Sequence, residues 1–168
     1  MNKAFTKEGE TEEALPEFVD ALPPGARNYM TPQGAARLQE ELQHLTDMER
    51  PQLAANKDSA PAKKRLREID QRIQYICQRL QITKVVDQSR RKDCGQVFFG
   101  ASVTYRDSSG AEHTVRIVGV DEARVDAGEV SWVSPLARAL SGAWLDEEVN
   151  FSSPAGVEKI AILNIEYL

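Results

Sequence analysis

The stretch Lys63–Leu80, KKRLREIDQRIQYICQRL, decides the first half of the fold. Its apolar residues recur at alternating steps of three and four, which is the heptad seam of a helix that packs on another helix. Most of the positions between them are charged or amide residues. The seam residues are Leu66, Ile69, Ile73, Ile76 and Leu80.

A second helix is predicted upstream of this stretch. Thr31-Pro32 indicates its start, because a hydroxyl N-cap is followed by proline in the first turn. Pro51 interrupts or ends it, and the polar segment Asn56–Pro61 is a short link to the seam helix. The two helices are therefore expected to form an antiparallel coiled-coil hairpin that closes on itself in a monomer. Its apolar positions in the first helix are Leu38, Leu42 and Leu45.

The period changes from helical to two at about Gln96, which predicts a small antiparallel sheet. A short helix is predicted over Ser134–Leu140, with Ser134 as its N-cap. Turns are expected at Asp107–Gly110 and Pro154–Gly156. The chain is therefore predicted to be α+β. The predicted strands are Gln96–Phe99, Ala101–Tyr105, Thr114–Val118, Glu129–Val133, Val149–Ser152 and Val157–Tyr167.

Composition divides the chain into three parts and excludes several classes of protein. Residues 1–28 are acidic and interrupted by proline, so we expect a flexible leader before a hairpin at 29–86 and a sheet domain at 87–168. The 21 Lys and Arg against 26 Asp and Glu give a net charge of -5, which argues against a protein that coats duplex DNA. No apolar run is long enough to span a membrane, and no secretory signal begins the chain. We expect a cytoplasmic protein without a cofactor of its own.

Five motifs in the same order resemble the Gre transcript-cleavage factors, especially their GreB branch. The first resembles the second coiled-coil arm of these factors, and the others resemble parts of their C-terminal domain. The resemblance covers roughly residues 29–168. The motifs are Lys63–Arg72, Val97–Ala101, Arg116–Glu122 (RIVGVDE), Val130–Leu140 (VSWVSPLARAL) and Ser153–Gly156 (SPAG).

This resemblance implies a coiled coil followed by an FKBP-like domain, and a function in transcription elongation. Members of the family bind bacterial RNA polymerase, dock at the mouth of its secondary channel and insert the coiled coil. Acidic residues at the tip then help the polymerase's own Mg²⁺ and water to hydrolyse backtracked nascent RNA. The chain would accordingly be an accessory factor to the polymerase and not an enzyme.

The acidic tip of the family is missing from this sequence. Family members carry a stretch like Gly-Asp-x-Ser-Glu-Asn-(Ala/Gly)-Asp-Tyr, whereas only Gln52–Ala62 lies here between flanks that match. A loss of a dozen residues shared between two arms would shorten the reach by about 9 Å. Asp58 is the only carboxylate in the link and the one candidate for a catalytic or Mg²⁺-binding role. Its simpler interpretation is an N-cap or first-turn acid, so efficient cleavage is not expected.

Two further groups of residues are candidate binding sites. The basic residues of the second helix either face RNA and the polymerase channel or form an ordinary solvated helix face. By resemblance, the Ser134-Pro135 turn lies near the polymerase rim. Trp132 is there either an exposed anchor or a core residue, and Arg138 is either an interface charge or an internal partner. The basic residues are Lys63, Lys64, Arg65, Arg67 and Arg72.

Two alternative functions remain open at this point. With a shortened tip, the protein could occupy the channel without cleavage and antagonise Gre factors. An FKBP-like domain could instead act as a prolyl isomerase or chaperone, with the helices as a handle. Fold alone does not establish that activity.

Overall fold

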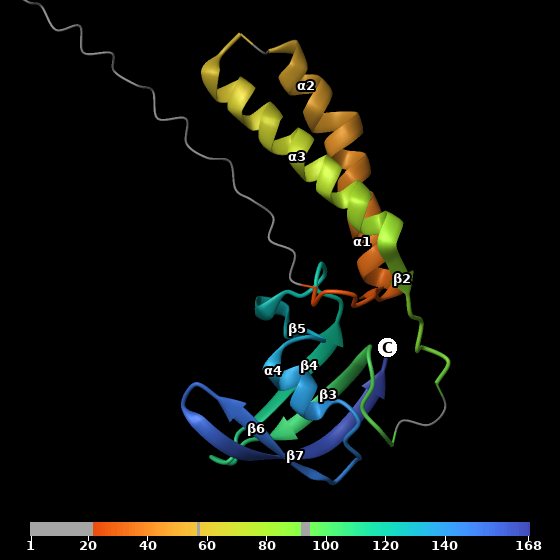
Figure 1. The fold of residues 1–168 in the computed structure, drawn as a ribbon, viewed down its shortest axis with the longest axis vertical. Coiled ribbons are helices and arrows are strands. Elements are labelled where there is room, and N and C mark those ends of the chain that lie inside the picture. The colour runs from red at the N-terminus through yellow and green to blue at the C-terminus, as the bar shows by residue number, and fades with distance from the viewer. Residues whose placement is uncertain (1–21, 57, 92–94) are drawn as a thin grey trace, which may run out of the picture.

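The computed structural model describes residues 22–56, 58–91 and 95–168, and its fold has two parts (Figure 1). A pair of long helical arms stands on a compact curled sheet. Residues 1–21 of the predicted leader lie outside the described residues. No helix in these three ranges is both long and apolar enough to cross a bilayer.

The two arms run antiparallel, as the seam predicts (Figure 1). The first consists of α1 (Pro32–His44), the π-helical turn η1 (Leu45–Glu49) and α2 (Arg50–Ala55), and the second is α3 (Ala60–Ile82). The Thr31 hydroxyl caps α1 by accepting a hydrogen bond from the Gly34 N–H, as expected from Thr31-Pro32.

The seam residues of α3 pack against the leucines of α1 and η1. Ile69 and Ile76 are fully buried with Leu38 and Leu45, and the remaining seam positions are half-buried. Burial of such side chains stabilises the arm pair by roughly 1.5–3 kcal/mol for each one fully buried. The arms therefore have an apolar core of their own.

Pro51 interrupts the first arm without ending it. A regular α-helix would bring its ring against the carbonyl of Asp47 and leave that carbonyl without a donor. The backbone forms a π turn over Leu45–Glu49 immediately before this proline, and the helix then continues to Ala55. The wider π turn accommodates the proline ring, so the helical arm continues past Pro51.

A short parallel pair of strands, β1 (Asn28–Met30) and β2 (Thr83–Val85), closes the base of the arms. The structured part therefore begins before residue 29, where the sequence prediction placed it. Asn28 is 1% exposed, because its side chain bonds to residues from three other segments. The periodicity of so short a strand gave no signal.

The main sheet has the order β5-β4-β3-β7-β6. Five of the six predicted strands were placed correctly, but Gln96–Phe99 is not a strand and contributes only one isolated bridge to Trp144. The prediction of a wholly antiparallel sheet is also wrong, because β4 and β5 pair in parallel. The connection between them crosses over through the short helix η2 (Val125–Ala127). A crossover is needed because a hairpin turn can join only antiparallel strands. The strands are β3 (Ala101–Arg106), β4 (Glu112–Val118), β5 (Glu129–Ser131), β6 (Glu148–Ser153) and β7 (Gly156–Tyr167).

The short helix α4 (Pro135–Leu140) covers the sheet near β5 and β6. Ser134 caps it, as predicted, by accepting a hydrogen bond from the Ala137 N–H at 3.2 Å. Ala137 and Leu140 are buried with strand residues such as Val103 and Ile160. This second core is separate from that of the arms, so the two parts meet through other contacts.

Candidate functional site

The tip of the arms presents a single described carboxylate, Asp58. The prediction that it caps α3 is wrong, because Ser59 is the N-cap and accepts from the Ala62 N–H at 3.3 Å. Ser59 is the better cap because its hydroxyl lies directly before the first helical residue. Asp58 is exposed and stands outside the helix, so its carboxylate faces solvent at the end of the arms.

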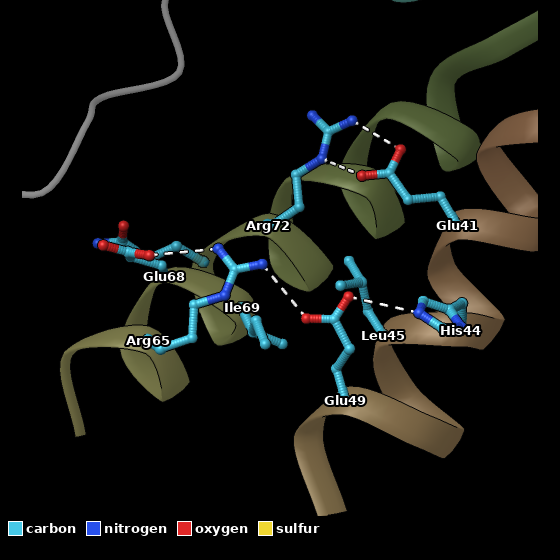
Figure 2. A pocket seen from close by; sticks show the side chains of 9 residues that line it. Glu41, His44, Leu45, Glu49, Arg65, Glu68, Ile69 and Arg72 are labelled. Atoms are coloured by element: carbon cyan, nitrogen blue, oxygen red, sulfur yellow. Dashed lines mark hydrogen bonds and ion pairs between the residues drawn. The ribbon is translucent and has the colours of Figure 1, made fainter. Parts of the chain in front are cut away.

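Three arginines on α3 stand seven residues apart and point to partners on other elements. The Arg72 guanidinium donates to both oxygens of Glu41, at 2.6 and 2.8 Å. This carboxylate raises the pKa of Arg72 above its usual value, against the opposing effect of burial. Arg65 donates to Glu49 at 3.2 Å (Figure 2). These positions flank the apolar seam, so the charge pairs join the two helices on either side of it. The arginines are Arg65, Arg72 and Arg79.

A pocket of about 350 Å³ lies between the arms beside these pairs (Figure 2). Its lining includes the side chains of Leu45 and Ile69 as well as those of the paired arginines and glutamates. Glu49 also lies 3.4 Å from His44 Nε2. Arg72 pairs with Glu41, and Arg65 is shared between Glu49 and Glu68. The pairs of Arg72 with Glu41 and of Arg65 with Glu49 join the two arms across this pocket.

The predicted basic patch therefore divides in two. Arg65 and Arg72 turn toward the first arm, whereas Lys63, Lys64 and Arg67 are exposed on the first two turns of α3. The prediction left two interpretations open, contact with RNA or the channel and an ordinary solvated helix face. The inter-arm pairs of Arg65 and Arg72 correspond to neither, and the exposure of the other three residues is compatible with both.

The residues of the predicted docking face lie on and beside α4. Pro135 and Arg138 are exposed, and Arg138 has no ion pair with any residue that the structure describes. Trp132 is half-buried against the sheet core, with its ring 5.7 Å from the ring of Tyr29 in an edge-on contact. Its indole N–H is buried and finds no acceptor within the described ranges. Trp132 thus supports the face from behind.

Sequence reasoning missed the junction between the arms and the sheet. There the buried Asp121 carboxylate accepts from Arg79 at 2.7 Å, from Tyr75 at 2.6 Å and from Asn28 at 3.0 Å. Burial, followed by the hydrogen bond to Asp121, raises the pKa of Tyr75 to about 12.

The next residue, Glu122, holds the other arm. Its carboxylate accepts from the Thr31 N–H at 2.9 Å, the Thr31 hydroxyl at 2.7 Å and the Gly119 N–H at 2.6 Å. The available signal was the pair of consecutive acids directly after a strand in RIVGVDE, but nothing local indicates their partners. Within the described ranges, no group of three or more His, Cys, Asp or Glu side chains could hold a metal ion.

Comparison with known proteins now adds the family. A family model described as "Transcription elongation factor, GreA/GreB, C-term" matches residues 92–167. A "Transcription elongation factor GreB" of Neisseria meningitidis is 41% identical, covering 84% of this chain and 95% of that protein. The chain belongs to the GreA/GreB family of transcription elongation factors. A GreB of Pseudomonas aeruginosa is 42% identical over 82% of this chain and 89% of that protein.

The relatives of this GreA/GreB chain also bear on the short tip. The alignment with the Neisseria protein spans 155 residues, whereas 84% of 168 residues is about 141 residues, so about 14 positions have no counterpart here. This difference agrees in size with the shortening expected between Pro51 and Lys63. A solved structure, "Prokaryotic transcription elongation factor GreA/GreB from Nitrosomonas europaea", is 20% identical with a TM-score of 0.41, covering 84% of this chain and 99% of that one.

Proposed function

We propose that this elongation factor binds bacterial RNA polymerase at the secondary channel and acts on backtracked complexes. The observation that carries the proposal is the 41% identity to a GreB over 95% of that protein's length. The exposed residues of α4, Pro135 and Arg138, and the projecting arms support it, because they separate a docking face from an element that can enter a channel. The FKBP-like character of the sheet part and the coiled-coil character of the arms belong to the same proposal.

The docking face centres on the exposed end of α4. Pro135 presents a rigid apolar ring, and Arg138 is a charge that no described residue pairs. A rigid proline ring loses little conformational entropy on binding, and arginine is common at interface hot spots. Trp132 fixes the backbone under this face by packing on Tyr29 and the sheet core.

The tip acts weakly or not at all in cleavage. Mg²⁺ binding and water activation need several hard oxygen ligands, and Asp58 supplies one carboxylate. The protein is in this proposal an accessory factor, and the polymerase performs the hydrolysis with its own Mg²⁺. Lys63, Lys64 and Arg67 face the nascent RNA or the acidic channel wall, where exposed cations favour phosphate.

Polymerase binding and transcript cleavage on the same backtracked complexes test this function. Pro135→Ala combined with Arg138→Ala should weaken binding about tenfold or more, because each residue is expected to contribute about 1 kcal/mol. Trp132→Phe should weaken binding less, since it keeps most of the packing. Pro154→Ala, in an exposed turn of the same sheet, is the matched control. Unchanged binding by the first variant overturns the docking face.

Cleavage separates the two readings of the tip. We expect little stimulation by the parent protein even when it saturates the polymerase, and no change with Asp58→Asn. Stimulation that Asp58→Asn abolishes would contradict this and make Asp58 a ligand of the polymerase's Mg²⁺.

A further inference from the structure

Asp121 and Glu122 are consecutive residues that hold opposite arms. Asp121 bonds to Arg79 and Tyr75 of α3, and Glu122 bonds to Thr31 at the start of α1. Both acids come from the turn that follows β4 in the sheet part. One turn of the sheet part therefore contacts both arms at their base.

These contacts are protected from water. The side chains of Arg79 and Asp121 are 5% and 3% exposed, and the Glu122 side chain is 2% exposed. A buried carboxylate that loses its donors keeps its desolvation cost, so partial opening of such contacts is strongly unfavourable. The geometry of the junction is correspondingly well defined.

Two glycines let the segments approach this closely. A Cβ on Gly34 would lie 1.5 Å from Glu122 Oε2, and one on Gly119 would lie 2.3 Å from the Tyr29 carbonyl oxygen. Close approach of backbone is a characteristic use of glycine. Glu122 is thereby seated directly against the first turn of α1.

The chain itself connects arms and sheet through one stretch, residues 86–100, between β2 and β3. Tyr29 adds ring contacts to Phe99 and Trp132, at 5.9 and 5.7 Å. Ring contacts tolerate a range of orientations, whereas charge-assisted hydrogen bonds fix direction. Arg37 on α1 adds a further ion pair, with Glu129 of β5 at 3.3 Å, but its side chain is 37% exposed. The two buried carboxylates are therefore the directional contacts of the junction that solvent screens least.

We propose that Asp121 and Glu122 are positioning residues that lock the arms in one direction relative to the sheet part. One attachment would leave an axis about which the arms could turn, and a second attachment on the other arm removes it. The role of this lock in the polymerase rests on the function proposed above: when the sheet part is docked, the lock determines where the tip of the arms lies.

Distance measurements between two spin labels test the lock without the polymerase. The labels replace exposed residues in Ala54→Cys on α2 and Val157→Cys on β7, in a chain that also carries Cys77→Ser and Cys94→Ser. The parent should give one narrow distance distribution. Asp121→Asn combined with Glu122→Gln should broaden and shift it.

Two further variants test whether the broadening comes from the junction. Glu122→Gln alone leaves the pair of Arg79 and Asp121 intact and should give a smaller broadening, which keeps the test valid if the double variant loses helical circular dichroism. Glu112→Gln, which removes an exposed 2.8 Å ion pair with Arg106 inside the sheet, should match the parent. A parent-like distribution in both junction variants overturns the lock.

The same chains then report on tip delivery. The double variant should bind polymerase like the parent. A photocrosslinker attached at Ala54→Cys should reach one set of polymerase sites in the parent and a broader set in the double variant. An unchanged crosslinking pattern, despite a broadened distance distribution, overturns the role in delivery. A parent that does not bind polymerase at all overturns the proposed function, and the distance distributions still decide the lock.

Discussion

The Thr31 hydroxyl makes two hydrogen bonds that join local and tertiary structure. It accepts from the Gly34 N–H as the cap of α1 and donates to Glu122. A capping residue alone contributes about 1 kcal/mol to a helix. Here the same hydroxyl also connects the helix to the sheet part. Substitutions near it should therefore change the free energy of unfolding by amounts that helix propensity does not predict.

Gly34→Ala shows this difference most clearly. Alanine in a helix is favoured over glycine by about 1 kcal/mol, so propensity alone predicts stabilisation. The added Cβ would overlap Glu122 Oε2, so we expect instead a net loss of about 1–2 kcal/mol in the free energy of unfolding. Urea denaturation measures it. Gln43→Ala, exposed on the same helix, is the control for propensity, and a stabilised Gly34→Ala would contradict the close approach.

Tyr75 makes stability depend on alkaline pH. Its pKa is raised to about 12 in the folded protein, so the folded state holds the phenol proton more tightly than the unfolded state. This contribution is fully present below pH ~10, the unfolded value, and is lost as pH rises from there to the folded pKa. Because the ring is only half-buried, we expect a loss on the order of 1 kcal/mol across this range.

Tyr75→Phe isolates the effect. Denaturation of both chains between neutral pH and pH ~11 should show a steeper decline in the parent than in the variant. Equal declines would show that Tyr75 titrates with a normal pKa.

At the scale of elements, charge pairs on either side of the seam add to the apolar core of the arms. Arg72 and Glu41 lie on opposite arms and are 29% and 40% exposed. Water and salt screen a pair at this exposure, so its bidentate geometry does not make it a strong one. The apolar seam carries most of the stability, and the arginines adjust the register.

A double-mutant cycle with Arg72→Gln and Glu41→Gln measures the coupling energy between these two side chains. We expect a coupling of about 0.5–1 kcal/mol, which decreases as salt is added. Arg106 with Glu112, a fully surface pair, is the comparison and should couple less. A coupling that salt does not change would contradict a solvent-exposed pair.

The sequence predicted elements whose signal is local. The heptad seam, the caps at Thr31 and Ser134, and the hairpin turn at Asp107–Gly110 each depend on residues a few positions apart. The β1–β2 pair was missed because each strand has only three residues, too few for a periodicity. The parallel pairing of β4 with β5 was missed because periodicity indicates a strand but not the direction of its neighbour.

The candidate site was predicted less completely for a related physical reason. Asp58, Pro135 and Arg138 are exposed and could be named from motifs. The partners of Asp121 and Glu122 lie 42 and 91 positions away in Arg79 and Thr31, so no spacing rule connects them. Arg65 and Arg72 look like a surface patch in sequence because their acidic partners are on the other arm.

At the scale of the whole molecule, two apolar cores are joined by a polar junction. One core lies between the arms and the other beneath α4. Separate cores unfold together only when the contacts between them are strong enough to couple them. The buried pair of Arg79 and Asp121 is the principal such contact, so removing one partner should affect cooperativity as well as stability.

Asp121→Ala should therefore split unfolding into two transitions. It leaves Arg79 buried without its carboxylate, at a cost of about 3–5 kcal/mol that falls on the junction and the arms. Hydrogen exchange should show amides of α1 and α3 losing protection together, while β3 and β7 keep theirs. Asp70→Asn, which breaks an exposed pair with Arg50 between the arms, should leave one transition. Equal loss of protection in arms and sheet would mean that the two cores are coupled through the aromatic contacts of Tyr29 instead.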